Sequence, residues 1–200
     1  MKKELGSHQG YIFDLDGTLV DSKLDFSALC RQLGWPPGTL ILEHLATLPQ
    51  AEQQHANAVI HQFELAGALQ ATLMPGVTDM LAEFAELGLP TAILTRNSKA
   101  VTELTLQRFE LPFDVVLTRD DAPAKPDPTG LWRIAEHWRI APAELLFIGD
   151  YLFDLETAKA AGMPSCLYLD GTNQHFSTQA DYQISHFVQL QQACRQWFRG

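Results

Sequence analysis

Cysteine is scarce in this sequence, and its three occurrences do not form a pattern typical of a disulfide framework or a zinc site. Cys30, Cys166 and Cys194 are odd in number, lie far apart and include no C-x-x-C pair. Sparing use of cysteine fits a reducing compartment, so we expect a cytoplasmic protein. The sequence also has no apolar run of roughly 18 residues, and no apolar segment follows the N-terminal lysines. We therefore expect neither a membrane-spanning helix nor a signal peptide.

Positive charge is scarce as well. The 200 residues include 14 Lys and Arg against 24 Asp and Glu, which gives a formal net charge of −10. Nucleic acids and anionic membranes attract clustered lysines and arginines, so we expect neither as a main partner. A small anionic substrate would still need local positive charge, which gives weight to a metal ion and to any lysine near the site. Both a monomer and a homodimer are compatible with this composition.

What the sequence does contain is an alternation of apolar strands and helices, interrupted by a block that is mostly helical. The predicted strands are residues 11–15, 90–95, 113–117, 145–149 and 165–169. Such alternation is typical of an α/β fold in which helices cover both faces of a parallel sheet. The helical block predicts an inserted cap over 20–74, with Asp21 and Ser22 at the start of its first helix. The core then comprises residues 1–19 and 75–200.

Two carboxylates follow the first predicted strand. The segment Tyr11-Ile12-Phe13 leads into Asp14-Leu15-Asp16-Gly17-Thr18. Side chains alternate along a strand, so Asp14 and Asp16 would face the same side for as long as the strand continues. Two neighbouring buried carboxylates repel each other and need a cation or an additional proton. Mg²⁺, which prefers oxygen ligands, would supply the missing charge.

Polar side chains also follow the other predicted strands. Thr95 ends the second strand, Lys125 follows the third after Asp120 and Asp121, and Asp150 ends the fourth. Ligands of parallel α/β sheets bind beyond the carboxyl ends of the strands. These residues are therefore expected to gather at one edge of the sheet.

Taken in order, these residues resemble the motifs of the haloacid dehalogenase-like hydrolase superfamily. The matching segments are Asp14-Leu15-Asp16-Gly17-Thr18, Thr95 after an apolar run, Lys125-Pro126-Asp127-Pro128, and Gly149-Asp150-Tyr151-Leu152-Phe153-Asp154. The helical block resembles the small cap of the phosphoglycolate phosphatase-like subgroup. The resemblance implies a Rossmann-like sheet with an inserted helical cap and an enzyme that hydrolyses phosphoric monoesters.

The resemblance also implies the roles of the acidic residues. Asp14 would attack phosphorus and form an aspartyl-phosphate, while Asp16 would protonate the leaving oxygen and then activate water. Mg²⁺ would be held by Asp14, the backbone carbonyl of Asp16 and Asp150. Asp154 would support the metal site or orient Lys125.

The remaining site residues would bind the phosphoryl group. Thr95 offers a hydroxyl at the start of a helix, where an anion is stabilised. Arg96 and Asn97 follow it and could face the substrate, and Lys125 would supply a fixed positive charge. The expected substrate is a small phosphorylated metabolite, such as a phosphoglycolate-like compound or a sugar phosphate.

Two alternatives remain open at this point. A phosphosugar mutase of the same family would share most of these residues, although Thr18 favours a phosphatase. A non-catalytic binding or regulatory protein could use the same fold, but it would be expected to lack at least one of the motif residues. Between Val20 and Met74 the only lysine or arginine residues are Lys23 and Arg31. We therefore expect a monophosphate with at most one further anionic group.

Overall fold

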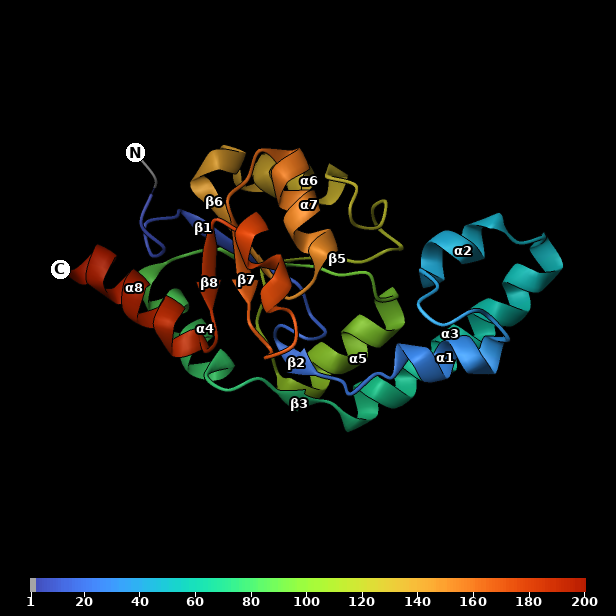
Figure 1. Ribbon diagram of the computed structural model, residues 1–200. Helices are drawn as coiled ribbons and strands as arrows, with labels where there is room; N and C mark the ends of the chain where they lie inside the picture. Colours follow the sequence, from blue (N-terminus) through green and yellow to red (C-terminus); the bar gives the residue numbers. More distant parts are fainter. Residues whose placement is uncertain (1–2) are drawn as a thin grey trace.

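In the computed structural model, which describes residues 3–200, a parallel sheet of six strands forms the centre of the molecule (Figure 1). Its order is β5-β4-β1-β6-β7-β8. The strands are β1 (Gly10–Phe13), β4 (Thr91–Leu94), β5 (Val115–Leu117), β6 (Leu145–Gly149), β7 (Ser165–Tyr168) and β8 (Tyr182–Ile184). This arrangement confirms the predicted Rossmann-like α/β class.

Helices cover both faces of the sheet because its strands are apolar on both sides. Tyr11 and Phe13 face one side, where they pack with Phe84 and Phe187. Ile12, between them, faces the other side. The first face is covered by α4 (Val77–Leu87), α5 (Lys99–Phe109) and α8 (Phe187–Arg199), and the second by α6 (Thr129–Trp138) and α7 (Leu152–Ala161). Each large side chain buried in this way stabilises the fold by about 1.5–3 kcal/mol.

A group of three helices lies apart from the sheet, at the right of Figure 1. It consists of α1 (Phe26–Leu33), α2 (Ile41–Thr47) and α3 (Gln50–Gln70), and we call it the cap. The cap has its own small core, in which Leu29, Leu45 and Ile60 pack together. Two antiparallel strands, β2 (Val20–Asp21) and β3 (Thr72–Leu73), connect it to the sheet domain. These two strands lie next to the predicted boundaries of the cap, at residues 20 and 74. The division of the chain into a core domain and a cap domain stays a prediction.

The first cap helix begins later than Asp21 and Ser22 predict. Asp25 caps α1, because its Oδ1 accepts a hydrogen bond of 2.9 Å from the Ala28 amide. Asp21 instead accepts one from Lys23, whose φ of 52° is incompatible with a helix. Three polar residues suitable as caps, Asp21, Ser22 and Asp25, lie within five positions, and only the turn at Lys23 decides among them.

Two further differences concern strands. β1 ends at Phe13, so strand alternation does not extend to Asp14 and Asp16. The edge strand β8 was not predicted, because three residues give too short an alternating pattern to stand out. Two short 3₁₀ helices, Pro142–Glu144 and Gln174–Gln179, complete the described elements. Within residues 3–200, no helix has the length and apolarity needed to cross a bilayer.

Candidate active site

The predicted site residues gather where neighbouring strands end. β4, β1 and β6 lie side by side in the sheet, and Thr95, Asp14 and Asp150 directly follow them. The Asp14 amide extends the strand ladder by donating to the Ile148 carbonyl at 2.8 Å. Strand order thus places side chains that are far apart in the sequence within one small region, as the sheet-edge rule predicts.

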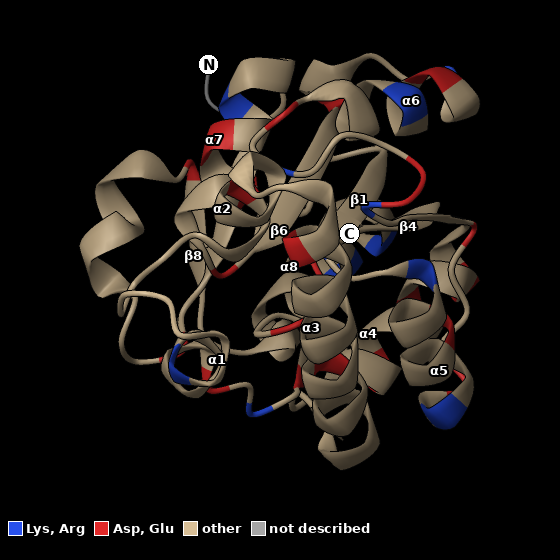
Figure 2. Cartoon of the chain, turned by 90° about the vertical axis from the view of Figure 1, so that its right-hand side faces the viewer, with Lys and Arg blue, Asp and Glu red and all other residues tan. Residues whose placement is uncertain are grey.

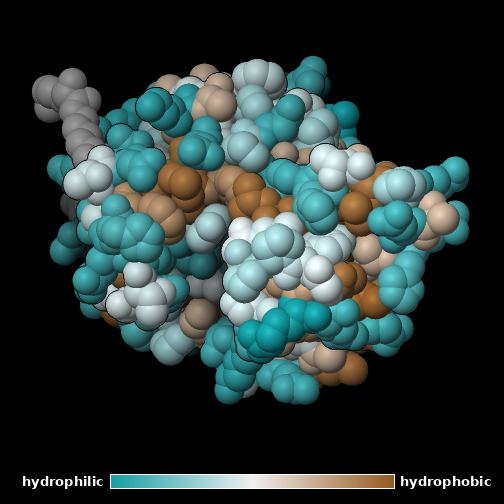
Figure 3. Space-filling view, turned by 45° about the vertical axis from the view of Figure 1, so that its right-hand side comes forward, coloured by the Kyte–Doolittle hydropathy of each residue, from teal (hydrophilic) through white to brown (hydrophobic). Residues whose placement is uncertain are grey.

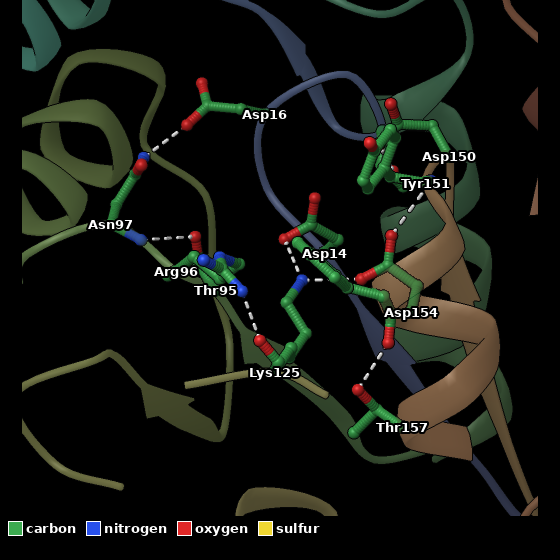
Figure 4. A network of polar contacts seen from close by, with 12 residues as sticks. Asp14, Asp16, Thr95, Arg96, Asn97, Lys125, Asp150, Tyr151, Asp154 and Thr157 are labelled. Carbon is green, nitrogen blue, oxygen red and sulfur yellow. Dashed lines mark hydrogen bonds and ion pairs between the residues drawn. The ribbon is translucent and has the colours of Figure 1, made fainter. Parts of the chain in front are cut away.

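Lys125 holds two carboxylates together at the centre of this region (Figure 4). Its Nζ lies 2.6 Å from Oδ1 of Asp14 and 2.6 Å from Oδ1 of Asp154. The lysine is only 3% exposed. Burial alone would lower its pKa, but the two carboxylates outweigh burial and raise it. Lys125 is therefore a fixed cation beside Asp14.

Negative charge nevertheless exceeds positive charge here. Asp14, Asp150 and Asp154 each offer a carboxylate oxygen, and these oxygens lie within 4.8 Å of one another. Burial raises the pKa of Asp14 to about 7 and raises that of Asp150 well above its ordinary value. Two buried carboxylates and one half-buried carboxylate share a single lysine, and a cation would compensate the excess negative charge. Because all the available ligands are oxygens, the cluster fits a hard divalent ion such as Mg²⁺.

The turn after β1 shapes this cluster. Gly17 has a φ of +82°, a conformation that a glycine adopts without strain. A Cβ atom at this position would lie 2.4 Å from Oδ2 of Asp150, so a side chain would displace the carboxylate. The neighbouring Thr18 hydroxyl donates to Oδ1 of Asp150 at 3.0 Å. The turn thus both makes room for Asp150 and orients it.

Asp16 lies in the same cavity but does not contact Asp14. Its side chain points toward Asn97, whose amide nitrogen donates to Oδ2 of Asp16 (Figure 4). Burial raises the pKa of Asp16, which favours a protonated carboxyl group. The separation follows from the end of β1 at Phe13, since the turn directs the two side chains differently.

The residues after β4 differ in what they contact. Thr95 is buried, and its hydroxyl accepts a hydrogen bond of 3.2 Å from the backbone amide of Asn97. Arg96 points toward the cap, where its Nη2 lies 2.8 and 2.9 Å from the two carboxylate oxygens of Glu43. Its guanidinium also donates to the Lys125 carbonyl and stacks on Phe153, 4.5 Å from the ring centre. Arg96 is therefore already engaged by the protein.

Sequence reasoning missed the residues that join the cap to the core. Glu43 pairs with Arg96, and Glu64 forms a two-point ion pair with Arg119, with N–O distances of 2.6 and 2.9 Å. Burial raises the pKa of Glu64, an effect that the arginine opposes. Asn173 was also missed; its side-chain amide donates to the backbone carbonyl of Asp150 at 2.7 Å. No local pattern reveals such contacts, because the ion-pair partners lie 53 and 55 residues apart.

Asp120 and Asp121, which also follow a strand, do not join the cluster. Asp120 accepts a hydrogen bond from the Lys99 amide, and Asp121 accepts from Thr118. Both aspartates stabilise the start of a helix or a turn. A position after a strand is thus not sufficient to bring a polar residue into the site.

A cavity of about 460 Å³ lies between the cap and the end of the sheet. Its floor carries the acidic cluster together with Asp16, Thr95, Asn97 and Lys125, and we call this side the core floor. The opposite side is formed by residues of α1, α2, α3 and the loop between α1 and α2, and we call it the cap wall. A buried lysine, an acidic cluster and a cavity at the carboxyl ends of the strands of a Rossmann-like sheet define an α/β enzyme site.

Comparisons with known proteins give the family. A profile of haloacid dehalogenase-like hydrolases matches residues 8–162. A haloacid dehalogenase-like hydrolase domain-containing protein from Arabidopsis thaliana is 32% identical, over 92% of this chain and 82% of its own length. The chain belongs to the haloacid dehalogenase-like hydrolases, as its motifs predict.

Two further relatives resemble the chain over most of its length. A phosphoglycolate phosphatase from Shigella dysenteriae is 29% identical, over 78% of this chain and 79% of that protein. The crystal structure of a candidate phosphoglycolate phosphatase from Lactobacillus plantarum has a TM-score of 0.77 at 24% identity, and covers 94% of this chain and 99% of its own. The structural likeness supports the fold.

Proposed function

We propose that this hydrolase is a Mg²⁺-dependent phosphatase that cleaves a small phosphoric monoester through an aspartyl-phosphate on Asp14. The observation that carries the proposal is the position of Asp14, whose carboxylate lies on the core floor 2.6 Å from a buried lysine. A nucleophile for phosphorus needs an adjacent positive charge, because the phosphoryl group that it attacks is an anion. Similarity to a phosphoglycolate phosphatase supports the same reaction.

The first step transfers the phosphoryl group to the enzyme. A carboxylate oxygen of Asp14 bonds to phosphorus as the bond from phosphorus to the ester oxygen breaks. Asp16 donates its proton to that oxygen, which leaves as an alcohol. Burial favours the protonated form of Asp16 before this step. Because Asp16 contacts Asn97, its side chain must turn toward the bound ester to act.

The second step returns the enzyme to its starting state. Asp16, now a carboxylate, takes a proton from water, and the water oxygen bonds to phosphorus as the bond to Asp14 breaks. Inorganic phosphate leaves, and Asp16 is protonated again. Thr95, Asn97 and Lys125 would bind the phosphoryl oxygens during both steps.

Asp14, Asp150 and the Asp16 backbone carbonyl would hold Mg²⁺, which would neutralise charge on the phosphoryl oxygens. Asp154 contacts Lys125 directly and also accepts a hydrogen bond of 3.0 Å from the Tyr151 amide. We therefore assign it the positioning of Lys125. Its carboxylate oxygen lies close enough to those of Asp14 and Asp150 to support the metal site as well.

The mutase alternative is less well supported by the cavity. A mutase must hold a second phosphate, and among the described residues that line the cavity Lys125 and Arg96 are the only lysine and arginine. Lys125 contacts Asp14 and Asp154, and Arg96 is paired with Glu43. A non-catalytic role would not explain why a lysine and several carboxylates are held together at this cavity.

Phosphate release from a panel of monoesters, with Mg²⁺ or with EDTA, tests the proposal. We expect turnover only with Mg²⁺, and a loss of at least about 10⁴-fold in Asp14→Asn, since the amide cannot form the covalent intermediate. Acid quenching followed by mass spectrometry should find phosphate on Asp14 in the active enzyme. Equal turnover by Asp14→Asn would overturn the assignment, and thermal unfolding of both proteins controls for folding.

A further inference from the structure

The cap wall differs chemically from the core floor. Its side chains are largely apolar, and they include Leu29 and Ile60 from the small cap core. Phe26 and Leu40 line the same cavity yet remain 54% and 46% exposed. Apolar surface of this kind is also visible as brown patches on the side of the molecule drawn in Figure 3. Large apolar side chains left open to a cavity favour a ligand that covers them.

The polar groups of the cap wall are mostly occupied. The Thr39 hydroxyl donates to the Pro36 carbonyl at 2.7 Å, and the Cys30 thiol lies 3.9 Å from the Thr39 carbonyl. Glu64 is paired with Arg119. Among the described polar side chains of the wall, this leaves Ser27 at the exposed rim. At the cap wall, a ligand rich in hydroxyl groups would therefore lose water without gaining equivalent hydrogen bonds.

Positive charge is equally limited at this end of the cavity. Figure 2 shows few blue positions on the cap helices. Arg96, the arginine that lines the cavity and reaches toward them, already has its charge matched by Glu43 at 2.8 Å. A second anionic group on the ligand would have to displace Glu43 to reach the guanidinium. The wall thus offers little to either a polyol or a second phosphate.

We infer that the alcohol part of the substrate is compact and apolar, an alkyl or aryl group rather than a polyol or a second phosphorylated centre. This inference rests on the proposed phosphatase function, because it takes the phosphoryl group to lie on the core floor. The ester then extends from the phosphoryl group toward Phe26, Leu29 and Leu40. Apolar pockets are common among ligand sites; here the separation of a polar floor from an apolar wall is what selects the substrate class.

A series of n-alkyl phosphates from ethyl to hexyl tests this inference. The alcohols in this series are nearly equal as leaving groups, so differences in kcat/KM report contact with the wall. We expect kcat/KM to rise about three- to fourfold per methylene until the cavity is filled. A flat or falling series, with phosphate still released, would overturn the inference and leave the proposed function intact.

A second comparison holds the carbon number constant. Sorbitol 6-phosphate and hexyl phosphate both have six carbons in the leaving alcohol, and only the first has additional hydroxyl groups. We expect hexyl phosphate to be preferred by at least about tenfold in kcat/KM. An equal or better rate with sorbitol 6-phosphate would refute the apolar class alone. Absence of turnover for every monoester with Mg²⁺ would instead refute the proposed function, and the inference with it.

A matched pair of variants locates the effect on the wall. Leu40→Asn places a polar group on the cap wall, whereas Leu69→Asn makes the same change at a cap position that is 56% exposed and does not line the cavity. We expect Leu40→Asn to lower the ratio of hexyl to ethyl turnover by at least about threefold. Leu69→Asn should leave that ratio unchanged. An equal effect of both variants, or of neither, would contradict the placement of the alkyl group.

Discussion

The core floor and the cap wall face the same cavity but are built by different physical means. The floor is charged, and two of its acidic groups are held by buried partners, Lys125 beside Asp14 and Thr18 beside Asp150. The wall is largely apolar and meets the floor through two ion pairs, Arg96 with Glu43 and Arg119 with Glu64. Under the proposed function, the floor carries out the chemistry and the wall selects the substrate.

Among changes to the core floor, removal of the Lys125 amine should cause the largest loss in the free energy of unfolding. Lys125→Met leaves Asp14 and Asp154 buried without their cation. We expect the free energy of unfolding to fall by about 3 kcal/mol in EDTA at pH 8, because an unpaired buried charge is costly. Urea denaturation measures the loss, and Lys159→Met, at an exposed lysine on α7, is the control. Equal losses in the two variants would mean that the floor does not depend on this charge.

Gly17→Ala should have the next largest effect. The variant forces a Cβ atom to within 2.4 Å of the Asp150 carboxylate at a φ of +82°. Gly38→Ala is a matched control, since its φ is +79° and no other atom lies within 4 Å of the added Cβ. Backbone strain of roughly 1–2 kcal/mol is common to both, and we expect Gly17→Ala to lose at least ~1 kcal/mol more. It should also weaken Mg²⁺ binding, measured by calorimetry, whereas Gly38→Ala should not.

The pH dependence of stability tests the charge imbalance of the floor. The pKa of Asp14 rises from 3.8 to about 7 on folding, so the folded chain holds this proton more tightly than the unfolded chain. Its contribution to stability is complete below pH 3.8 and is lost as the pH rises through 7. In EDTA, this group alone should lower the free energy of unfolding by about 1.4 kcal/mol between pH 6 and pH 8.

Urea denaturation of the parent protein and of Asp14→Asn at both pH values checks this expectation. The variant lacks the titrating group, so its stability should change less with pH. Mg²⁺ should restore the stability of the parent at pH 8, because it binds the ionised carboxylates of the folded state. A parent protein that becomes more stable from pH 6 to pH 8 in EDTA would contradict the assignment.

The smallest effect is expected where the wall meets the floor. Glu43→Gln removes the charge that matches Arg96. Because Glu43 is partly exposed, stability should fall by at most about 1 kcal/mol. The released arginine should instead favour an anionic leaving group, so kcat/KM for 2-phosphoglycolate relative to ethyl phosphate should rise a few-fold. Glu86→Gln, which removes an exposed ion pair with Arg199 outside the cavity, should leave that ratio unchanged.

Much of the floor could be predicted from the sequence. Apolar runs predicted the strands, and the edge rule then placed Asp14, Thr95, Lys125 and Asp150 together without coordinates. The orientation of Asp16 could not be predicted in the same way. It depends on where β1 ends and on Asn97, which is 81 residues away.

The sequence alone determined what depends on short windows: the strand and helix periodicity, the interrupting helical block and the polar residues at strand ends. Tertiary structure decided which charges meet. The pairing of Arg96 with Glu43 and of Arg119 with Glu64 leaves no local signature. The same holds for the hydrogen bond from the Asn173 side chain to the Asp150 backbone carbonyl. The physical reason is that periodicity arises from interactions between near neighbours in the chain. Contacts between the cap and the core form only when the whole chain has packed.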